Sequence, residues 1–521
     1  MYLVGKIVKA FIDFASRRDN PYCDVSLAQK EQFFRLIKTA RNTEFGKHYS
    51  FSDLVNLPFE KAYDRFRTQI PIYDYSKMYK EWWYMTLEGV PDVTWIGKIK
   101  YFALSSGTTE GPSKYIPVSK QMLKAIRKGS LRVMYSLPLY NLPDWYYQKD
   151  VLLLGGSTSM KPIGKGQYAG DLSGIMSADV PTWFNLFYKP PRKITAIKDW
   201  NKKIDAIVKN AHKWDVGTMV AVPPWAQLLL ERIVEHYKIE NIHQIWSHFS
   251  VLVFGGLSFK PYEKTFESLL GKPIITIETY LASEGYVAYQ ARPNARGLRL
   301  LADNGIFFEF VPFNSDNFDE EGNVKPGAHA LWWEEVRENV DYAILLNTCA
   351  GSWRYLLGDT VKIVDKEGGE IIITGRTKHY LSVTGEHLSV ENMSMAVDQL
   401  AEQLQVAIPE FTVYPYRVGR FWAHKWFLGT TRQINIPSEE LSQMLDEILK
   451  RLNDDYTTER SSALKEIKVF ALPVKTFYQW MEQRGKLGAQ NKFPRVLKGE
   501  QIEQWEEFLK TQGLIPDDGN A

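Results

Sequence analysis

The sequence predicts an α/β protein of at least two domains, on three observations. The chain has 521 residues, which is too long for a single hydrophobic core. Patterns typical of helices and of strands alternate along most of it. Short apolar runs end at glycine pairs, as buried parallel strands do where they enter loops. In sheets of this class, ligands bind beside the loops at the carboxyl ends of the strands.

The chain begins with a predicted amphipathic helix. Residues 1–18 alternate apolar and charged side chains, and they lack the continuous apolar stretch and the small-residue cleavage site of a signal peptide. We expect this helix to pack on the body of the protein, with attachment to a membrane surface as the alternative. No segment has the roughly 20 apolar residues that a bilayer-spanning helix needs.

A segment rich in hydroxyl side chains follows the apolar residues Tyr101, Phe102 and Leu104, which we interpret as the end of a buried strand. Its small residues let the backbone approach an anion closely. Main-chain N–H groups, hydroxyls and an ammonium could hold the oxygens of a triphosphate here. The residues concerned are Ser105, Ser106, Gly107, Thr108, Thr109, Gly111 and Lys114.

Two other phosphate-binding patterns do not fit this segment. A Walker-type loop requires G-x-x-x-x-G-K-[ST], but Gly111 is followed by Pro112 and Ser113 before the lysine. The dinucleotide pattern G-x-G-x-x-G is absent, because no glycine lies two places after Gly107. An ordinary surface turn stays open on composition alone, since serine, glycine, threonine and proline are its usual residues.

The middle of the chain predicts the α/β body. Residues 150–154 and 249–254 are apolar runs that stop at glycine pairs, and we interpret them as buried parallel strands. Between them, residues 202–214 and 225–237 have helical spacing. Residues 274–277 predict another buried strand, which leads directly into Tyr280, Ser283 and Glu284.

The last third of the chain predicts a hairpin and then a small α+β domain. Residues 361–364 and 371–374 form the hairpin, and Gly375 and Arg376 follow it. Beyond it we expect helices at 390–404, 438–452 and 501–511, two strands within 411–427, and a strand at 467–472.

Four segments resemble, in the same order, motifs of the acyl acid-amido synthetases, the auxin-responsive promoter family within the luciferase-like adenylate-forming enzymes. Residues 105–117 fit S-S-G-T-[ST]-x-G-x-x-K-x-x-P, and residues 280–284 fit Y-x-x-S-E. Residues 354–359 resemble the Y-R-x-G-D segment, and residues 485–495 resemble G-x-x-x-x-Q-x-K-x-P-R. Each motif is short, but four across nearly the whole chain make the resemblance specific. The chain is similar to a compact, prokaryotic-type member.

One position departs from the family pattern. Leu356 stands where the Y-R-x-G-D motif has its arginine, which puts the role of that arginine in doubt. Arg354 lies two residues earlier, close enough in the chain to compensate.

The resemblance implies a fold and a division into domains. We expect residues 1–377 to form a large adenylate-forming domain that binds ATP and the acyl acid. Residues 378–521 would form a mobile C-terminal domain, with the hinge at residues 376–380.

The resemblance also implies roles for individual residues. Lys114, Glu284 and Lys492 would be catalytic, with Lys492 reaching the reacting groups when the domains close. Glu284 would hold Mg²⁺ near the α-phosphate, because that hard cation prefers carboxylate oxygens. Asp359 would accept hydrogen bonds from the ribose hydroxyls. The residues that would contact ATP are Ser105, Ser106, Gly107, Thr108, Thr109, Gly111, Lys114, Tyr280, Ser283, Glu284, Asp359 and Arg376.

Composition limits the partners and the compartment. The net charge of +3 is nearly balanced, whereas a protein that binds nucleic acid electrostatically would be far more basic. Cys23 and Cys349 are the only cysteines, so no disulfide framework is available and we expect a reducing, cytoplasmic location.

The function implied is ATP-dependent amide synthesis. A carboxylic acid would be activated as its acyl adenylate with release of pyrophosphate, and the amine of an amino acid would then displace AMP. Two alternatives stay open: an acyl-CoA ligase that shares the adenylation step, and a catalytically inactive nucleotide-binding module. The sequence names neither the acid nor the amine, and it leaves the oligomeric state open.

Overall fold

The computed structural model divides the chain into two compact units. The first is Met1–Leu257, Leu269–Phe318 and Val324–Ile373, and the second is Ser258–Ser268, Asp319–Asn323 and Thr374–Ala521. Their assignment to separate functional steps stays a prediction. The residues that the structure describes are 3–18, 24–105, 114–155, 160–177, 187–197, 199–256, 259–319, 322–377, 381, 388, 390–418, 421–461, 464–487 and 492–515.

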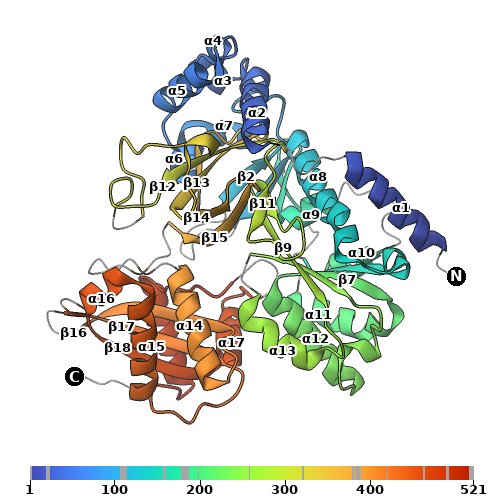
Figure 1. Ribbon diagram of the computed structural model, residues 1–521, viewed down its shortest axis with the longest axis vertical. Coiled ribbons are helices and arrows are strands. Elements are labelled where there is room, and N and C mark those ends of the chain that lie inside the picture. Colours follow the sequence, from blue (N-terminus) through green and yellow to red (C-terminus); the bar gives the residue numbers. More distant parts are fainter. Residues whose placement is uncertain are drawn as a thin grey trace. The chain divides into compact units, whose positions relative to one another are not determined.

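An eleven-stranded mixed sheet runs through the first unit (Figure 1). In the described residues, five strands at one end are parallel and the pairs at the other end are antiparallel. In sheet order the strands are β12 (Ile306–Pro312), β13 (Asp341–Thr348), β14 (Tyr355–Asp365), β15 (Glu370–Arg376), β11 (Leu298–Leu300), β10 (Gly285–Tyr289), β9 (Ile275–Ala282), β8 (Val251–Gly255), β7 (Val216–Val220), β3 (Asp150–Leu153) and β6 (Tyr188–Lys189).

The parallel end of this sheet confirms the α/β prediction. The runs at 150–154 and 249–254 are the parallel strands β3 and β8, as predicted. Helices α11 (Trp200–Asn210) and α12 (Pro223–Tyr237) form at the predicted places. Asp199 caps α11 by accepting a hydrogen bond from the Lys202 amide, and α12 opens on two prolines, which tolerate the first helical turn.

A second sheet of the first unit has the order β2-β1-β5-β4. Its strands are β1 (Tyr101–Ser105), β2 (Lys114–Val118), β5 (Gln167–Gly170) and β4 (Lys161–Gly164). β1 and β2 are antiparallel and pair Ser105 with Lys114. β1 therefore confirms the predicted strand, and the hydroxyl-rich segment joins two paired strands.

Helices precede and separate these sheets, and the sequence patterns predicted only the first of them. They are α1 (Leu3–Arg18), α2 (Val25–Ala40), α3 (Glu44–His48), α4 (Phe51–Leu54), α5 (Phe59–Gln69), α6 (Tyr75–Met78), η1 (Tyr79–Trp83), α7 (Tyr84–Leu87), α8 (Lys120–Ser136), η2 (Leu137–Tyr140), η3 (Asp144–Gln148), α9 (Leu172–Ser177), α10 (Arg192–Thr195), η5 (Ala211–Lys213), η6 (Ile242–Gln244) and η8 (Trp333–Glu335).

Aromatic packing joins the early helices to the sheet. The Phe33 ring of α2 makes edge contacts with Phe59 and Phe66 of α5 and with Phe307 of β12, at centroid distances of 5.4, 5.2 and 5.1 Å. Phe33, Phe66 and Phe307 are almost fully buried. Burial of such rings is a large hydrophobic contribution, and the edge geometry adds to it.

The second unit is a smaller α+β structure. Its sheet is β16 (Glu410–Val418), β17 (Phe421–Thr430) and β18 (Leu464–Pro473), with β17 antiparallel to β16 and parallel to β18. Figure 1 shows α14 and α15 side by side on this sheet. The predicted helices and strands of the last third are thereby confirmed. The helices are α13 (Glu263–Leu269), most of which belongs to this unit, α14 (Val390–Leu404), α15 (Ser438–Leu452), α16 (Asp454–Ser461), α17 (Val474–Gln483) and α18 (Glu500–Thr511), with η7 (Lys260–Tyr262) before α13.

Candidate active site

Two of the motif segments meet through a hydrogen bond in the first unit. The hydroxyl of Tyr280, on β9, donates to Oδ2 of Asp359, on β14, at 2.6 Å. β9 and β14 are four positions apart in the sheet, about 19 Å if the sheet were flat. That span exceeds the combined reach of a tyrosine and an aspartate side chain. The antiparallel end of the sheet must therefore curl, and the curl brings the two motifs together.

A second contact joins the same two segments. Glu284, only 8% exposed, lies at the turn between β9 and β10, close enough to Tyr355, the first residue of β14, for its carboxylate charge to act on the tyrosine hydroxyl. Burial, and then the negative charge of Glu284, raise the pKa of Tyr355 well above its ordinary value. Tyr355 therefore keeps its proton in the neighbourhood of the Glu284 carboxylate.

Tyr75 links this pair to the end of the hydroxyl-rich segment. Tyr75, at the start of α6, is close enough to Tyr355 to raise its pKa further. Its hydroxyl accepts a hydrogen bond from the backbone N–H of Tyr115 at 2.9 Å. The ammonium of Lys114 lies 5.4 Å from the centre of the Tyr75 ring, within cation–π distance. Lys114, Glu284 and Asp359 therefore belong to one neighbourhood of the first unit.

The backbone before Tyr75 is held against the start of β14. The N–H of Tyr73 donates to the Arg354 carbonyl at 3.0 Å, and the N–H of Leu356 donates to the Tyr73 carbonyl at 2.7 Å. This parallel bridge aligns Tyr75 and Tyr355 on neighbouring stretches of chain. Sequence reasoning missed Tyr73 and Tyr75, because no motif marks them and they lie more than 200 residues before Glu284.

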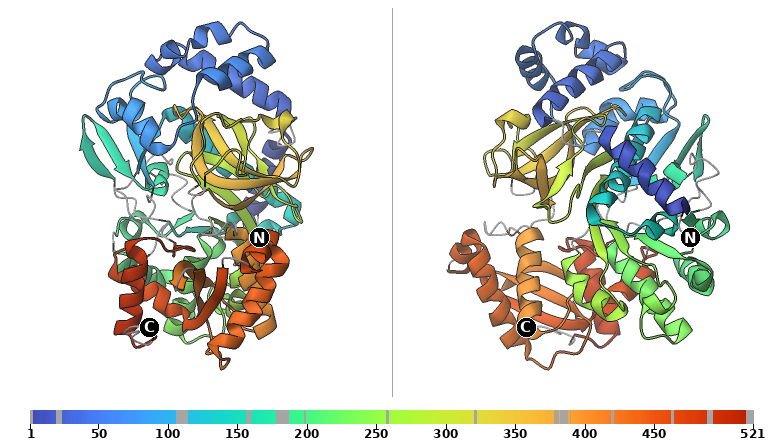
Figure 2. Two further views of the ribbon diagram at one scale, coloured as in Figure 1. Left: turned by 90° about the vertical axis from the view of Figure 1, so that its left-hand side faces the viewer. Right: turned by 45° about the vertical axis from the view of Figure 1, so that its right-hand side comes forward.

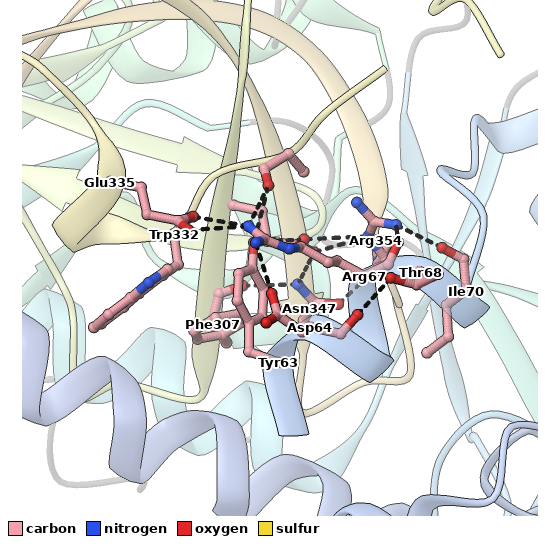
Figure 3. Close-up of polar contacts among 12 residues, drawn as sticks. Tyr63, Asp64, Arg67, Thr68, Ile70, Phe307, Trp332, Glu335, Asn347 and Arg354 are labelled. Carbon is pink, nitrogen blue, oxygen red and sulfur yellow. Dashed lines mark hydrogen bonds and ion pairs between the residues drawn. The ribbon is translucent and has the colours of Figure 1, made fainter. Parts of the chain in front are cut away.

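Arg354 does not take the place of the missing motif arginine, so that expectation is wrong. Its side chain is buried in the network of Figure 3. Nε donates to both carboxylate oxygens of Glu309, at 3.2 and 3.3 Å. Nη1 donates to the carbonyls of Arg67 and Ile70, at 2.5 and 2.6 Å. These bonds hold the guanidinium in the protein interior, where it supports the fold.

The same network fixes the backbone at the start of β14. Asn347 accepts from the Arg354 N–H at 2.7 Å and donates to Glu309 at 3.0 Å. Tyr63 donates to Glu309 at 3.1 Å. Arg354 itself has a φ of +43°, an unfavourable angle for a residue with a Cβ, so these contacts hold strained backbone. Tyr355 follows immediately, so the network positions a residue that lies close to Glu284.

Glu278 is a further titratable residue that the sequence analysis did not single out. It precedes Tyr280 by two residues on β9, so both side chains project from the same face of the strand. Burial raises the pKa of Glu278 to about 7. Its position in a strand whose other residues are uncharged was the available signal, since a carboxyl group is unusual in an interior strand.

The other predicted site residues divide into three groups. Ser106, Gly107, Thr108, Thr109 and Gly111 lie outside the described residues. Ser105 ends β1, and Ser283 is half-buried beside Glu284. Arg376 and Lys492 belong to the second unit, where Lys492 is exposed. Over the described ranges, no cluster of three or more histidine, cysteine, aspartate or glutamate side chains forms a metal site.

The sequence matches three family models along most of its length. They are the GH3 family N-terminal domain over residues 22–166, the central domain over 299–369 and the C-terminal domain over 391–501. The fold of the chain is that of the adenylate-forming enzymes. The chain belongs to the GH3 family.

Individual proteins whose names place them in the GH3 family are also similar to this chain in sequence or in structure. The indole-3-acetic acid-amido synthetase GH3.4 of Arabidopsis thaliana is 24% identical over 277 residues, which are 49% of this chain and 45% of that protein. The chain spans less than half the length of the curated relatives it matches. The structure of GH3.15 acyl acid amido synthetase has a TM-score of 0.76 at 15% identity and covers 95% of both chains. A 2-hydroxyisobutyryl-CoA ligase bound to an acyl-AMP has a TM-score of 0.56 at 10% identity, over 93% of this chain and 91% of that one.

Proposed function

We propose that the protein is an ATP-dependent ligase that joins a carboxylic acid to the amine of an amino acid through an acyl adenylate. The observation that carries this proposal is the convergence of Lys114, Glu284 and Asp359 in the first unit. Membership of the GH3 family supports it. The adenylate-forming fold supports the first half-reaction in particular.

The chemistry requires activation of the acid. A carboxylate is a poor electrophile, because its charge repels nucleophiles and oxide is a poor leaving group. In the proposed first step a carboxylate oxygen attacks the α-phosphorus of ATP, and pyrophosphate leaves. In the second step the amine attacks the acyl carbon, loses a proton and displaces AMP.

The residues of the first unit are suited to the first step. Lys114 is suited to neutralise the charge of phosphate oxygens. The hydroxyls of Ser105, Ser106, Thr108 and Thr109 are suited to donate hydrogen bonds to the same oxygens. Asp359, held in one orientation by Tyr280, is suited to accept from ribose hydroxyls.

Glu284 is suited to bind the Mg²⁺ ion that accompanies ATP. Its buried carboxylate lies close to Tyr355, and carboxylate oxygen is the ligand that Mg²⁺ prefers. When bound, the ion would neutralise charge on the phosphates. We also propose that Arg376 contacts ATP and that Lys492 contacts the reacting carboxylate.

Two measurements test the proposal. The first is pyrophosphate release with ATP, Mg²⁺ and a broad panel of organic acids, which we expect to require all three components. The second is product analysis when the active acid is offered with amino acids or with coenzyme A. An amide with release of AMP supports the proposal. A thioester without any amide would make the protein an acyl-CoA ligase, and no pyrophosphate release from any acid would favour a binding module.

A further inference from the structure

Helix α1 is pinned to the first unit through one face. The Gly5 N–H donates to Oε1 of Gln148 at 3.3 Å, and Nζ of Lys9 pairs with Asp144 at 3.3 Å. A Cβ on Gly5 would lie 2.0 Å from the Asp144 carbonyl oxygen, so only glycine permits this approach. Ile12, 2% exposed, completes the contact. The predicted packing of α1 on the body of the protein is therefore confirmed for this face.

The opposite face of α1 exposes large apolar side chains. Leu3, Val4, Ile7 and Phe11 are 71, 54, 61 and 63% exposed, and Phe14 is 56% exposed. At 3.6 residues per turn, these positions fall within an arc of about 100°. Exposed apolar residues are ordinary when they are scattered singly, but a continuous stripe along one helix indicates an interaction surface.

Charge on and around this stripe is positive. Among the side chains of α1 whose exposure the structure describes, the exposed charged ones are Lys6 and Arg17, which lie along one edge of the stripe. Asp13 lies nearer the face of α1 that packs on the first unit, where its charge helps raise the pKa of Tyr147. α8 packs beside α1 (Figure 2) and contains five basic residues and no acidic ones. Two of the five, Lys128 and Arg132, pair with Asp303, which leaves Lys120, Lys124 and Arg127 as the basic residues of α8 that can add to the charge beside the stripe. Leu131 of α8 and Leu139 of η2, which also packs against α1, are 37 and 50% exposed.

We propose that α1 docks the protein on the surface of a lipid bilayer that contains anionic headgroups. A rigidly mounted helix with an apolar stripe and a basic border can bury the stripe at the level of the acyl chains while the border contacts headgroup phosphates. No helix in the described residues is long and apolar enough to cross a membrane, so the helix lies in the plane of the interface. This inference does not depend on the proposed ligase activity.

The test uses the full-length protein and sedimentation with vesicles of phosphatidylcholine alone or with 30% phosphatidylglycerol. We expect binding to the anionic vesicles that weakens as salt is raised. Ile7→Ser/Phe11→Ser should weaken this binding at least tenfold. Lys6→Glu/Arg17→Glu should weaken binding to anionic vesicles and leave any binding to neutral ones unchanged. Leu27→Ser is the matched control, because Leu27 is 58% exposed on a different helix, α2.

Unchanged urea midpoints would show that the variants remain folded, as expected for exposed positions. Failure of the wild-type protein to bind either vesicle would overturn the proposal, as would equal binding by the wild type and Ile7→Ser/Phe11→Ser. A dimer in light scattering that this double variant converts to a monomer, without vesicle binding, would also overturn it, since a second copy of the chain would then cover the stripe.

Discussion

Replacement of Arg354 by methionine tests whether the buried network holds the start of β14. Arg354 is 3% exposed and Glu309 is fully buried, so Arg354→Met leaves a carboxylate in the interior without its cation. Loss of one partner of such a pair costs about 3–5 kcal/mol. The Ile70 carbonyl also loses its donor, which adds about 1–3 kcal/mol if water does not replace it. We therefore expect a loss of about 5 kcal/mol.

A double-mutant cycle isolates the ion pair. Glu309→Gln alone leaves the guanidinium buried without a full counter-charge, whereas Glu309→Gln with Arg354→Met leaves no unpaired charge. The double variant should therefore lose less stability than the sum of the single losses, by about 2 kcal/mol. The control is Lys165→Met, because Lys165 pairs with Glu88 at 2.6 Å but both side chains are exposed.

Urea unfolding gives the free energies, and hydrogen exchange locates the change. Arg354→Met should raise exchange in α5 and at the start of β14, because Nη1 bonds the carbonyls at the end of that helix. It should also lower pyrophosphate release, because Tyr355, a close neighbour of Glu284, directly follows Arg354 and would shift with it. A urea midpoint for Arg354→Met that is no lower than the midpoint for Lys165→Met would refute the reasoning. So would a stability loss in the double variant equal to the sum of the two single losses.

Three further outcomes follow from the site. Glu284→Ala should reduce pyrophosphate release far more than ATP binding measured by calorimetry, because charge neutralisation matters most as charge develops; equal losses would contradict the assigned role. Tyr280→Phe removes one hydrogen bond to a carboxylate and should lower kcat/KM for ATP by about tenfold, with no change in the urea midpoint beyond about 1 kcal/mol. Glu278 has a raised folded pKa, so the stability it contributes is complete below about pH 4.5 and is lost as pH rises to about 7, by about 3 kcal/mol in all. Glu278→Gln should remove this decline in urea midpoints measured from pH 4.5 to 8, and a parallel decline in both proteins would count against the burial of Glu278.

The sequence predicted the helices and strands whose own residues show a helical or strand-like pattern of apolar side chains. Residues 390–404 and 438–452 have helical spacing and form α14 and α15 with those bounds. The strands before the glycine pairs formed as expected. Helix α1 also formed where its periodicity indicated, but its pattern left open which face would be buried. That outcome depends on Gly5 and Lys9 meeting η3, which follows more than 100 residues later.

The buried network had no comparable signal. Tyr63, Glu309, Asn347 and Arg354 come from α5, β12, the end of β13 and the residue before β14. Each is an ordinary polar residue in its own segment, and charged residues are exposed far more often than buried. The motif suggested that Arg354 could compensate for the arginine that Leu356 replaces. Its closeness to Leu356 in the chain, however, said nothing about which side of the backbone its guanidinium would occupy.

Convergence of Tyr280 and Asp359 depends on a property that no single strand encodes. Each strand is readable from its apolar run, yet a flat sheet would keep β9 and β14 apart. The strand register shifts between Tyr286 and Ala288 and between Ala343 and Leu345. Such irregularities bend strands and increase their twist, and both lie in the part of the sheet that must curl. An extra residue bends a strand only because the neighbouring strand lacks it. The sequence alone does not show which strand pairs with β13, so it does not show this bend either. The site is therefore set by pairing between strands, while the motifs supply the side chains that this pairing brings together.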